Sequence, residues 1–172
     1  MKSKFALAGH PIHPMLVAIP IGLFVWAFVC DLVYLTGGRD LMWYDLAFWT
    51  GIAAWSTGLI AALPGFGDYF TVAIKTDARE MGAAHMVLNV TTVALFFVAM
   101  LLMLDRGATS GGMLAAVVVL HGAGLGLVSL SGWLGGEMVY RHHIAVVPDT
   151  GELETEEVSR HREHGALRPR PR

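Results

Sequence analysis

The sequence predicts an all-α protein, an integral membrane four-helix bundle with up-down-up-down topology. Its 172 residues are 55 % hydrophobic and only 15 % charged, and the mean hydropathy of +0.55 is that of a membrane protein. Four apolar runs reach the length needed to cross a hydrocarbon core about 30 Å thick. Short connections between these runs make successive helices antiparallel neighbours, as in an up-down bundle.

The apolar runs divide the chain into spans and connections. The predicted helices cover 14–36, 43–63, 78–104 and 111–140, with connections at 37–40, 64–77 and 105–107. Lys2 and Lys4 precede the first run as they would in a signal peptide. That run is too long for a signal peptide, however, and no small-residue cleavage pattern follows it. We therefore expect the first run to be a permanent span.

Three regions follow: a cytoplasmic lead-in at 1–13, the transmembrane bundle at 14–143, and a disordered, charged cytoplasmic tail at 144–172. The side that holds both termini and the second connection carries more Lys and Arg near the spans than the opposite side. These residues are Lys2, Lys4, Lys75, Arg79 and Arg141, against Arg39 and Arg106. The positive-inside rule then places both termini in the cytoplasm.

Two histidines precede the first span, each directly before a proline, in the segment His10-Pro-Ile-His-Pro14. Proline disfavours the α conformation of the residue before it, so we expect His10 and His13 to be extended and Pro14 to be the first helical residue. Antiparallel spans bring this segment to the membrane face that also holds the end of the second helix, the start of the third and the end of the fourth. The polar residues expected at this face are His10, His13, Asp68, His85, Asn89, Glu137, His142 and His143.

Histidines on different helices predict a b-type haem in a small electron-transfer protein, because haem b in a bundle takes two imidazoles at a similar depth. The first and third helices are diagonal in a square bundle, so we expect His13 and His85 to be axial ligands, with His142 as a substitute for either. Asp68 and Glu137 are then expected beside the haem. His85 lies roughly 10 Å along a third helix that begins at residue 78, so His13 has to dip into the membrane or that helix has to begin outside it.

Two other functions fit the same face. A mixed set of imidazoles and carboxylates suits iron or zinc in a metal-binding or transport protein. That set is His10, His13, His85, Asp68 and Glu137. Alternatively, the face joins helix ends in a non-catalytic accessory subunit of a larger membrane complex. His10 then lies in the headgroup layer, His85 bonds to a neighbouring helix, at Asp68 or Tyr69, and Glu137 pairs with Arg141 four residues on.

His121 and Asp31 fall in the opposite half of the bilayer. His121 is about 24 Å from Glu137 along the fourth helix, so it cannot share a metal with His85. The sequence offers no second histidine in that half to complete another bis-histidine haem. Asp31, near the far end of the first span, is expected to reach the opposite interface.

Composition and motifs exclude several classes of function. A net charge of -2 without a basic patch argues against nucleic-acid binding. Cys30, the one cysteine, allows neither an internal disulfide nor a cysteine-ligated cluster, and we expect a buried thiol. The sequence contains no nucleophile elbow, phosphate-binding loop or zincin pair, which favours an electron-transfer or accessory subunit over a stand-alone enzyme. Gly122/Gly126 and Gly132/Gly136 predict tight packing within the bundle, or else a homodimer or room for a flat macrocycle beside the glycines.

Four motifs together resemble a known family. They are His10-Pro-Ile-His-Pro14, Gly67-Asp-Tyr69, His85 with Asn89, and the closing run from Gly132 through Tyr140-Arg-His142. They resemble a bacterial membrane family catalogued as the domain of unknown function 2231, over residues 9 to about 146. The resemblance implies a four-helix protein of the bacterial inner membrane. Some relatives are joined to a Rieske-type domain, which implies redox work with a separate Rieske-type partner here. Many relatives have glycine in place of His143.

Overall fold

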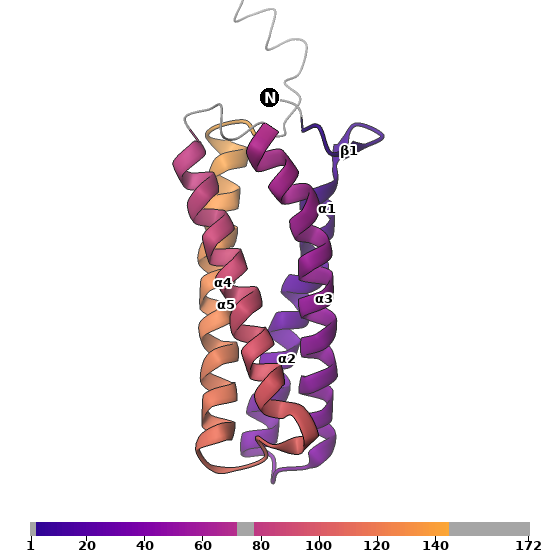
Figure 1. Cartoon of the computed structure of the whole chain (residues 1–172), viewed down its shortest axis with the longest axis vertical. Helices are drawn as coiled ribbons and strands as arrows, with labels where there is room; N and C mark the ends of the chain where they lie inside the picture. Colours follow the sequence, from indigo (N-terminus) through magenta and orange to yellow (C-terminus); the bar gives the residue numbers. More distant parts are fainter. Residues whose placement is uncertain (1–2, 72–77, 145–172) are drawn as a thin grey trace, which may run out of the picture.

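The four predicted spans are present in the computed structural model, which describes residues 3–71 and 78–144 (Figure 1). Helical segments long and apolar enough to cross a membrane cover Ile12–Thr36, Leu41–Thr71, Arg79–Arg106 and Gly111–Tyr140. Successive spans run in opposite directions, so the predicted all-α up-down-up-down membrane bundle is confirmed. The predicted tail lies outside the described residues except for its first residue, Ile144.

A short hairpin and two helices make up the N-terminal part of the chain. They are β1 (Ala6–Leu7), β2 (His10–Pro11), α1 (Ile12–Leu16) and α2 (Ala18–Thr36). The two strands pair antiparallel, with Leu7 opposite His10. The helices separate at Val17 because Pro20 lacks the amide hydrogen that would bond the carbonyl of Leu16.

His13 is helical, so the extended conformation predicted for it was wrong, whereas His10 is extended in β2. Helix α1 begins at Ile12, two residues before the predicted start. Pro14 is tolerated there because the first amides of a helix have no intrahelical acceptor. The side chain of His13 bonds to α3, and this tertiary contact overrides the conformational preference of a residue before proline.

Helix α3 (Leu41–Thr71) is longer than predicted because it continues through Pro64. The connection predicted at 64–77 was therefore wrong for 64–71, and 72–77 lie outside the described residues. Pro64 removes the amide hydrogen that would bond the carbonyl of Ile60. Pro64 is nevertheless buried, and α1 packs against α3, so tertiary packing offsets the lost hydrogen bond.

The second half of the chain follows the predicted spans closely. It consists of α4 (Arg79–Met103), the 3-10 turn η2 (Leu104–Arg106) and α5 (Gly111–Tyr140). Helix α2 packs along α3 and α4 along α5, while α3 with α4 and α2 with α5 join the two pairs less extensively. Helices α2 and α4 are therefore diagonal, as predicted for the first and third spans.

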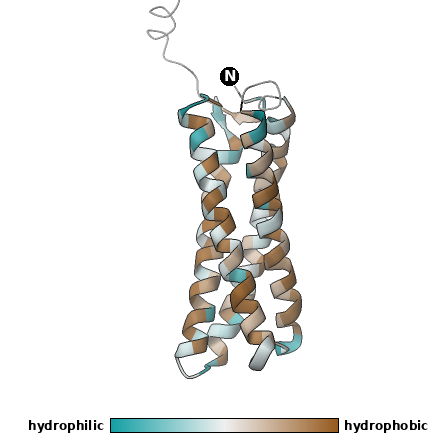
Figure 2. Ribbon diagram, turned by 90° about the vertical axis from the view of Figure 1, so that its left-hand side faces the viewer, coloured by the Kyte–Doolittle hydropathy of each residue, from teal (hydrophilic) through white to brown (hydrophobic). Residues whose placement is uncertain are grey.

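Hydrophobic residues occupy most of each helix, and hydrophilic ones gather towards the ends of the bundle (Figure 2). One buried cluster includes Cys30, Tyr34, Tyr44, Met103 and Val117. A second buried cluster contains Phe24, Ala27, Ala54 and Phe96. Cys30 is fully buried, as predicted.

The glycines of α5 differ in their surroundings. A Cβ atom at Gly122 would lie 3.2 Å from the ring of Phe28, so this glycine lets α5 approach α2 closely. Gly126, Gly132 and Gly136 have no atom of a packing neighbour within 4 Å of such a Cβ. The tight packing predicted for both small-residue pairs therefore holds at Gly122 and not at the other three positions.

Candidate functional site

His13 lies against α3 where that helix passes through Pro64 and Gly65. Its Nδ1 atom is 2.8 Å from the carbonyl oxygen of Ala61. A Cβ atom at Gly65 would lie 2.8 Å from the same Nδ1, so the glycine leaves room for the imidazole. Ala61 and Gly65 thus form a seat for His13 on α3.

His85 belongs to a polar network between α4 and α5. Its Nδ1 is 2.8 Å from the carbonyl oxygen of Ser131 and 2.9 Å from Oγ of the same residue. The side-chain nitrogen of Asn89 lies 3.0 Å from Nε2 of His85 and 2.6 Å from Oγ of Ser131. The predicted bond from His85 to a neighbouring helix therefore exists, but it is made to Ser131 and not to Asp68-Tyr69. A Cβ at Gly135 would lie 3.3 Å from the ring.

The imidazoles of His13 and His85 meet inside the bundle. Their ring centroids are 6.1 Å apart and their planes are inclined at 88°. The sequence suggested that His85 lies deeper in the membrane than His13. The two rings nevertheless meet, because α1 carries His13 into the bundle. Two imidazoles that bind one metal ion from opposite sides, through metal–nitrogen bonds of about 2 Å, have centroids about 6 Å apart. The spacing of this pair therefore suits a shared ion.

Hydrogen bonding assigns the tautomer of both rings. A carbonyl oxygen only accepts, so Nδ1–H of His13 donates to Ala61 and Nδ1–H of His85 donates to Ser131. Nε2 then carries the lone pair in each neutral ring, and the amide of Asn89 donates to it in His85. A backbone carbonyl that holds Nδ1–H is the usual outer contact of a histidine that binds metal through Nε2.

Three of the other predicted site residues have partners of their own. His10 is exposed, and its Nδ1 bonds a carbonyl of its own hairpin. The hydroxyl group of Ser3 donates to the carboxylate of Asp68, with Oγ 2.7 and 2.8 Å from its two oxygens. Glu137 forms an ion pair with Arg141 at 2.7 Å, as predicted. None of these contacts involves His13 or His85.

His142 follows the end of α5, seven residues beyond Gly135, which faces His85. Seven residues correspond to roughly 10 Å along a helix, and the role of His142 as a substitute ligand stays a prediction. Within 3–71 and 78–144, no three His, Cys, Asp or Glu side chains gather closely enough to hold a metal ion. The five-residue metal set is therefore not assembled in this part of the chain.

A second polar centre, not anticipated from the sequence, joins α2 to α5 in the other half of the bundle. Nδ1 of His121 lies 2.5 Å from Oδ2 of Asp31, and these side chains are 0 % and 3 % exposed. The expectation that Asp31 reaches the interface was wrong, because the imidazole compensates the burial of its carboxylate. One acid and one imidazole in the same half of two adjacent apolar spans were the signal in the sequence.

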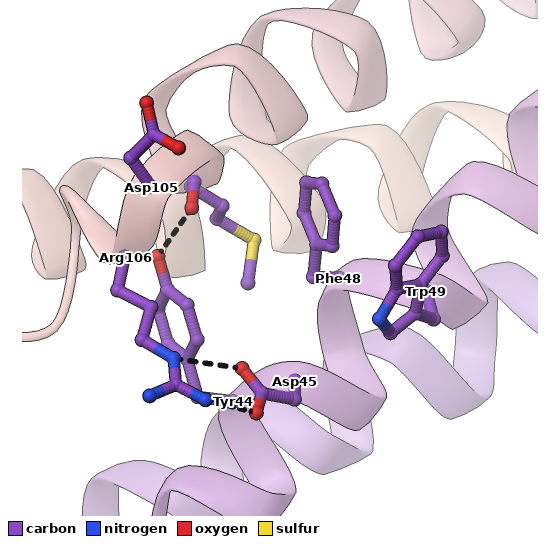
Figure 3. Close-up of a pocket in the computed structure, with 7 residues that line it drawn as sticks. Tyr44, Asp45, Phe48, Trp49, Asp105 and Arg106 are labelled. Carbon is purple, nitrogen blue, oxygen red and sulfur yellow. Dashed lines mark hydrogen bonds and ion pairs between the residues drawn. The ribbon is translucent and has the colours of Figure 1, made fainter.

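A pocket of about 240 Å³ lies at the end of the bundle formed by η2 and the start of α3 (Figure 3). Its lining includes Tyr44, Phe48 and Trp49. Asp45 and Arg106 face each other there and form an ion pair at 2.6 Å, so the guanidinium is already neutralised. The pocket contains no histidine and is separate from both polar centres.

Both polar centres and all four spans lie within residues 9–148, the part of the chain that matches a known family. No curated protein and no solved structure matches the chain. Residues 9–148, however, match a family described as predicted membrane protein (DUF2231), in agreement with the extent expected from the motifs. The chain therefore belongs to this family of predicted membrane proteins.

Proposed function

We propose that the chain is a small b-type cytochrome-like electron-transfer protein, in which His13 and His85 are the axial ligands of haem b. The observation that carries the proposal is the meeting of two imidazoles from opposite helix pairs, with centroids 6.1 Å apart. Both Nδ1 atoms bond to backbone carbonyls. Each ring therefore presents Nε2, the nitrogen that would bind iron.

The number of imidazoles favours haem over a bare ion. A porphyrin supplies four nitrogens to its iron, so the protein has to add only two axial ligands. Zinc sites in proteins take three or four protein ligands. His13 and His85 provide two, and the described residues contain no group of three donors. The pair thus supplies as many ligands as haem takes from a protein, and fewer than zinc takes.

The surroundings of the pair suit ligation. Gly65 and Gly135 are the residues against which the two rings pack, so each ring lies close to a helix backbone that fixes its position. The amide of Asn89 has to release Nε2 of His85 before that atom can bind iron. Asn89 keeps a partner when it does so, because Oγ of Ser131 lies 2.6 Å from its nitrogen.

Haem b would supply reversible one-electron chemistry, with a potential set in part by its axial ligands. The residues of this chain would hold and orient it. Ala61 and Ser131 fix the imidazoles through their carbonyl groups. Asp68 and Glu137, predicted beside the haem, instead bond to Ser3 and Arg141 and stabilise the same end of the bundle.

The proposal includes a location and a partner. The charge bias of the connections predicts that both termini are cytoplasmic, in a bacterial inner membrane. Helix α1, which carries His13, lies at the end of the bundle near the N-terminus (Figure 1), so the pair would exchange electrons from the cytoplasmic side. A Rieske-type redox protein and a homodimer stay predictions of the sequence.

The test is the haem content of the full-length protein purified in mild detergent. Optical spectra and pyridine haemochrome assays are compared for wild type, His13→Ala and His85→Ala. His10→Ala is the matched control, because it removes an exposed imidazole of the same N-terminal segment. We expect wild type and control to hold about one haem per chain. The haem content of both test variants should be at least about ten-fold lower.

Other outcomes separate the remaining functions. A wild-type protein without a Soret band contradicts the haem proposal. Stoichiometric iron or zinc without porphyrin then favours a metal-ion-binding protein. If His85→Ala lowers thermal stability while the cofactor content is unchanged, the polar network is structural. That result favours the hypothesis of a non-catalytic accessory subunit.

A further inference from the structure

The pair of Asp31 and His121 leaves one imidazole nitrogen without a partner. Among the described residues, Nε2 of His121 is a buried polar atom that makes no hydrogen bond. The ring stacks on Phe96, with centroids 4.3 Å apart and planes inclined at 16°. Buried polar groups are nearly always hydrogen-bonded, so this exception requires a physical reason.

Each protonation state of the pair has one unfavourable feature. With Nε2 bare, Nδ1–H donates to the carboxylate of Asp31 and the pair carries a net negative charge in an apolar interior. With a proton on Nε2, the pair is an ion pair of zero net charge, but the new N–H group has no acceptor. Neither state satisfies every group, and Nε2 of His121 is the atom at which the two states differ.

Other titratable groups near the pair are already committed. Cys30 and Tyr34 on α2 and Tyr44 on α3 belong to the buried cluster at this level. The hydroxyl groups of Tyr34 and Tyr44 donate to the backbone carbonyls of Thr109 and Met103. Helix α4 presents Phe96, and its titratable residues, Arg79, Glu80 and His85, lie towards its other end. His121 is therefore the residue that compensates the charge of Asp31.

We infer that Asp31 and His121 form a proton-exchange site inside the membrane, at which Nε2 of His121 gains and loses the proton. The site lies ten residues before Ser131 on α5, roughly 15 Å from the His13–His85 pair. Exchange changes the net charge of the pair by one unit, with the proton taken from water and returned to it. The inference needs no haem and stands independently of the proposed function.

The test follows the protonation of His121 in the full-length protein, labelled with ¹⁵N-histidine and held in lipid nanodiscs. We expect the Nε2 resonance of His121 to change with pH within the range in which the bundle stays folded, while Nδ1 keeps its proton. An Nε2 atom that stays in one protonation state across this range overturns the inference. The measurement is made on haem-free and haem-loaded protein, so its result does not depend on haem binding.

Two variants locate the effect. Asp31→Asn removes the negative charge that stabilises the protonated ring, so we expect Nε2 to stay unprotonated throughout the range. His10→Gln, the control, removes an exposed imidazole and should leave the His121 titration unchanged. If Asp31→Asn does not fold, infrared spectra of the wild type provide the test. We expect the carboxylate band of Asp31 to shift with pH together with the His121 resonance. A carboxylate band that does not change with pH contradicts the inference.

Discussion

The bundle contains two histidine centres that differ in what holds Nδ1. At one end, Nδ1 of His13 and of His85 donates to backbone carbonyls, and the rings lie against glycines. In the other half, Nδ1 of His121 donates to the carboxylate of Asp31, and the ring lies against Phe96. A carbonyl partner is neutral, whereas a carboxylate brings a full charge into the membrane.

The two centres also differ in burial and in the charge beside the ring. The rings held by carbonyls are half-buried, and their centroids lie 6.1 Å apart, with Nε2 of His85 bonded to the amide of Asn89. The ring held by a carboxylate is fully buried, and the charge of its partner makes a proton the natural ligand. In both centres the group that accepts from Nδ1 fixes the orientation of the ring and leaves Nε2 as the nitrogen that can take a ligand.

The largest effect on stability is expected at the carboxylate-held centre. Asp31→Ala leaves a buried imidazole without its partner and should lower the free energy of unfolding by about 3–5 kcal/mol. The double variant Asp31→Leu/His121→Leu removes both polar groups and should recover most of that loss. Reversible unfolding in mixed detergent micelles measures both. A double variant that is no more stable than Asp31→Ala would contradict this account of the pair.

A smaller loss is expected when the seat of His13 is filled. The Cβ atom of Gly65→Ala would lie 2.8 Å from Nδ1 of His13, and overpacking of this kind costs about 1–3 kcal/mol. Gly126→Ala is the control, because no packing neighbour lies within 4 Å of its Cβ. Haem content should fall with Gly65→Ala and stay at the wild-type level with Gly126→Ala. Equal haem content in the two variants would show that Gly65 does not position His13.

The polar network of His85 should contribute less still. Ser131→Ala removes the hydroxyl group that accepts from Asn89, at an expected cost of about 1–2 kcal/mol. Ser129→Ala is the matched control, because its exposed hydroxyl bonds to a carbonyl of its own helix. The same unfolding assay compares the two variants. If both have the stability of wild type, the network does not hold His85 in place.

The smallest effect is expected at the exposed pair of Asp45 and Arg106. Ion pairs that are open to water contribute little to stability because solvent screens them. Asp45→Asn should leave the melting temperature unchanged within the error of a thermal scan, although Figure 3 shows two bonds between these groups. A drop in melting temperature as large as that of Asp31→Ala would contradict the expected difference between buried and exposed ion pairs.

Apolar length and spacing predicted most of the fold. Four runs of membrane length and short connections determine an up-down bundle, and that topology brings His13 and His85 to one end. The extension of α3 through Pro64 could not be read from the sequence, because proline normally ends a helix. Here burial of the proline and the packing of α1 outweigh the lost hydrogen bond.

The second centre was missed for a related reason. Asp31 lies within a few residues of the end of α2, so its distance from the interface alone predicted an exposed carboxylate. Which face of α2 it occupies depends on the rotation of that helix against α5. The rotation is set by side-chain packing across the bundle, where Phe96 stacks on His121. A single sequence does not carry that information.

The central claim is that His13 and His85 together hold one haem, and low-temperature electron paramagnetic resonance of the oxidised protein tests it most directly. Two imidazoles with planes inclined at 88° predict a low-spin ferric signal of the strongly anisotropic type that near-perpendicular axial imidazoles produce. The signal should be present in wild type and in His10→Ala, and absent from His85→Ala. A protein without a ferric haem signal, or one whose signal survives His85→Ala, would contradict the account.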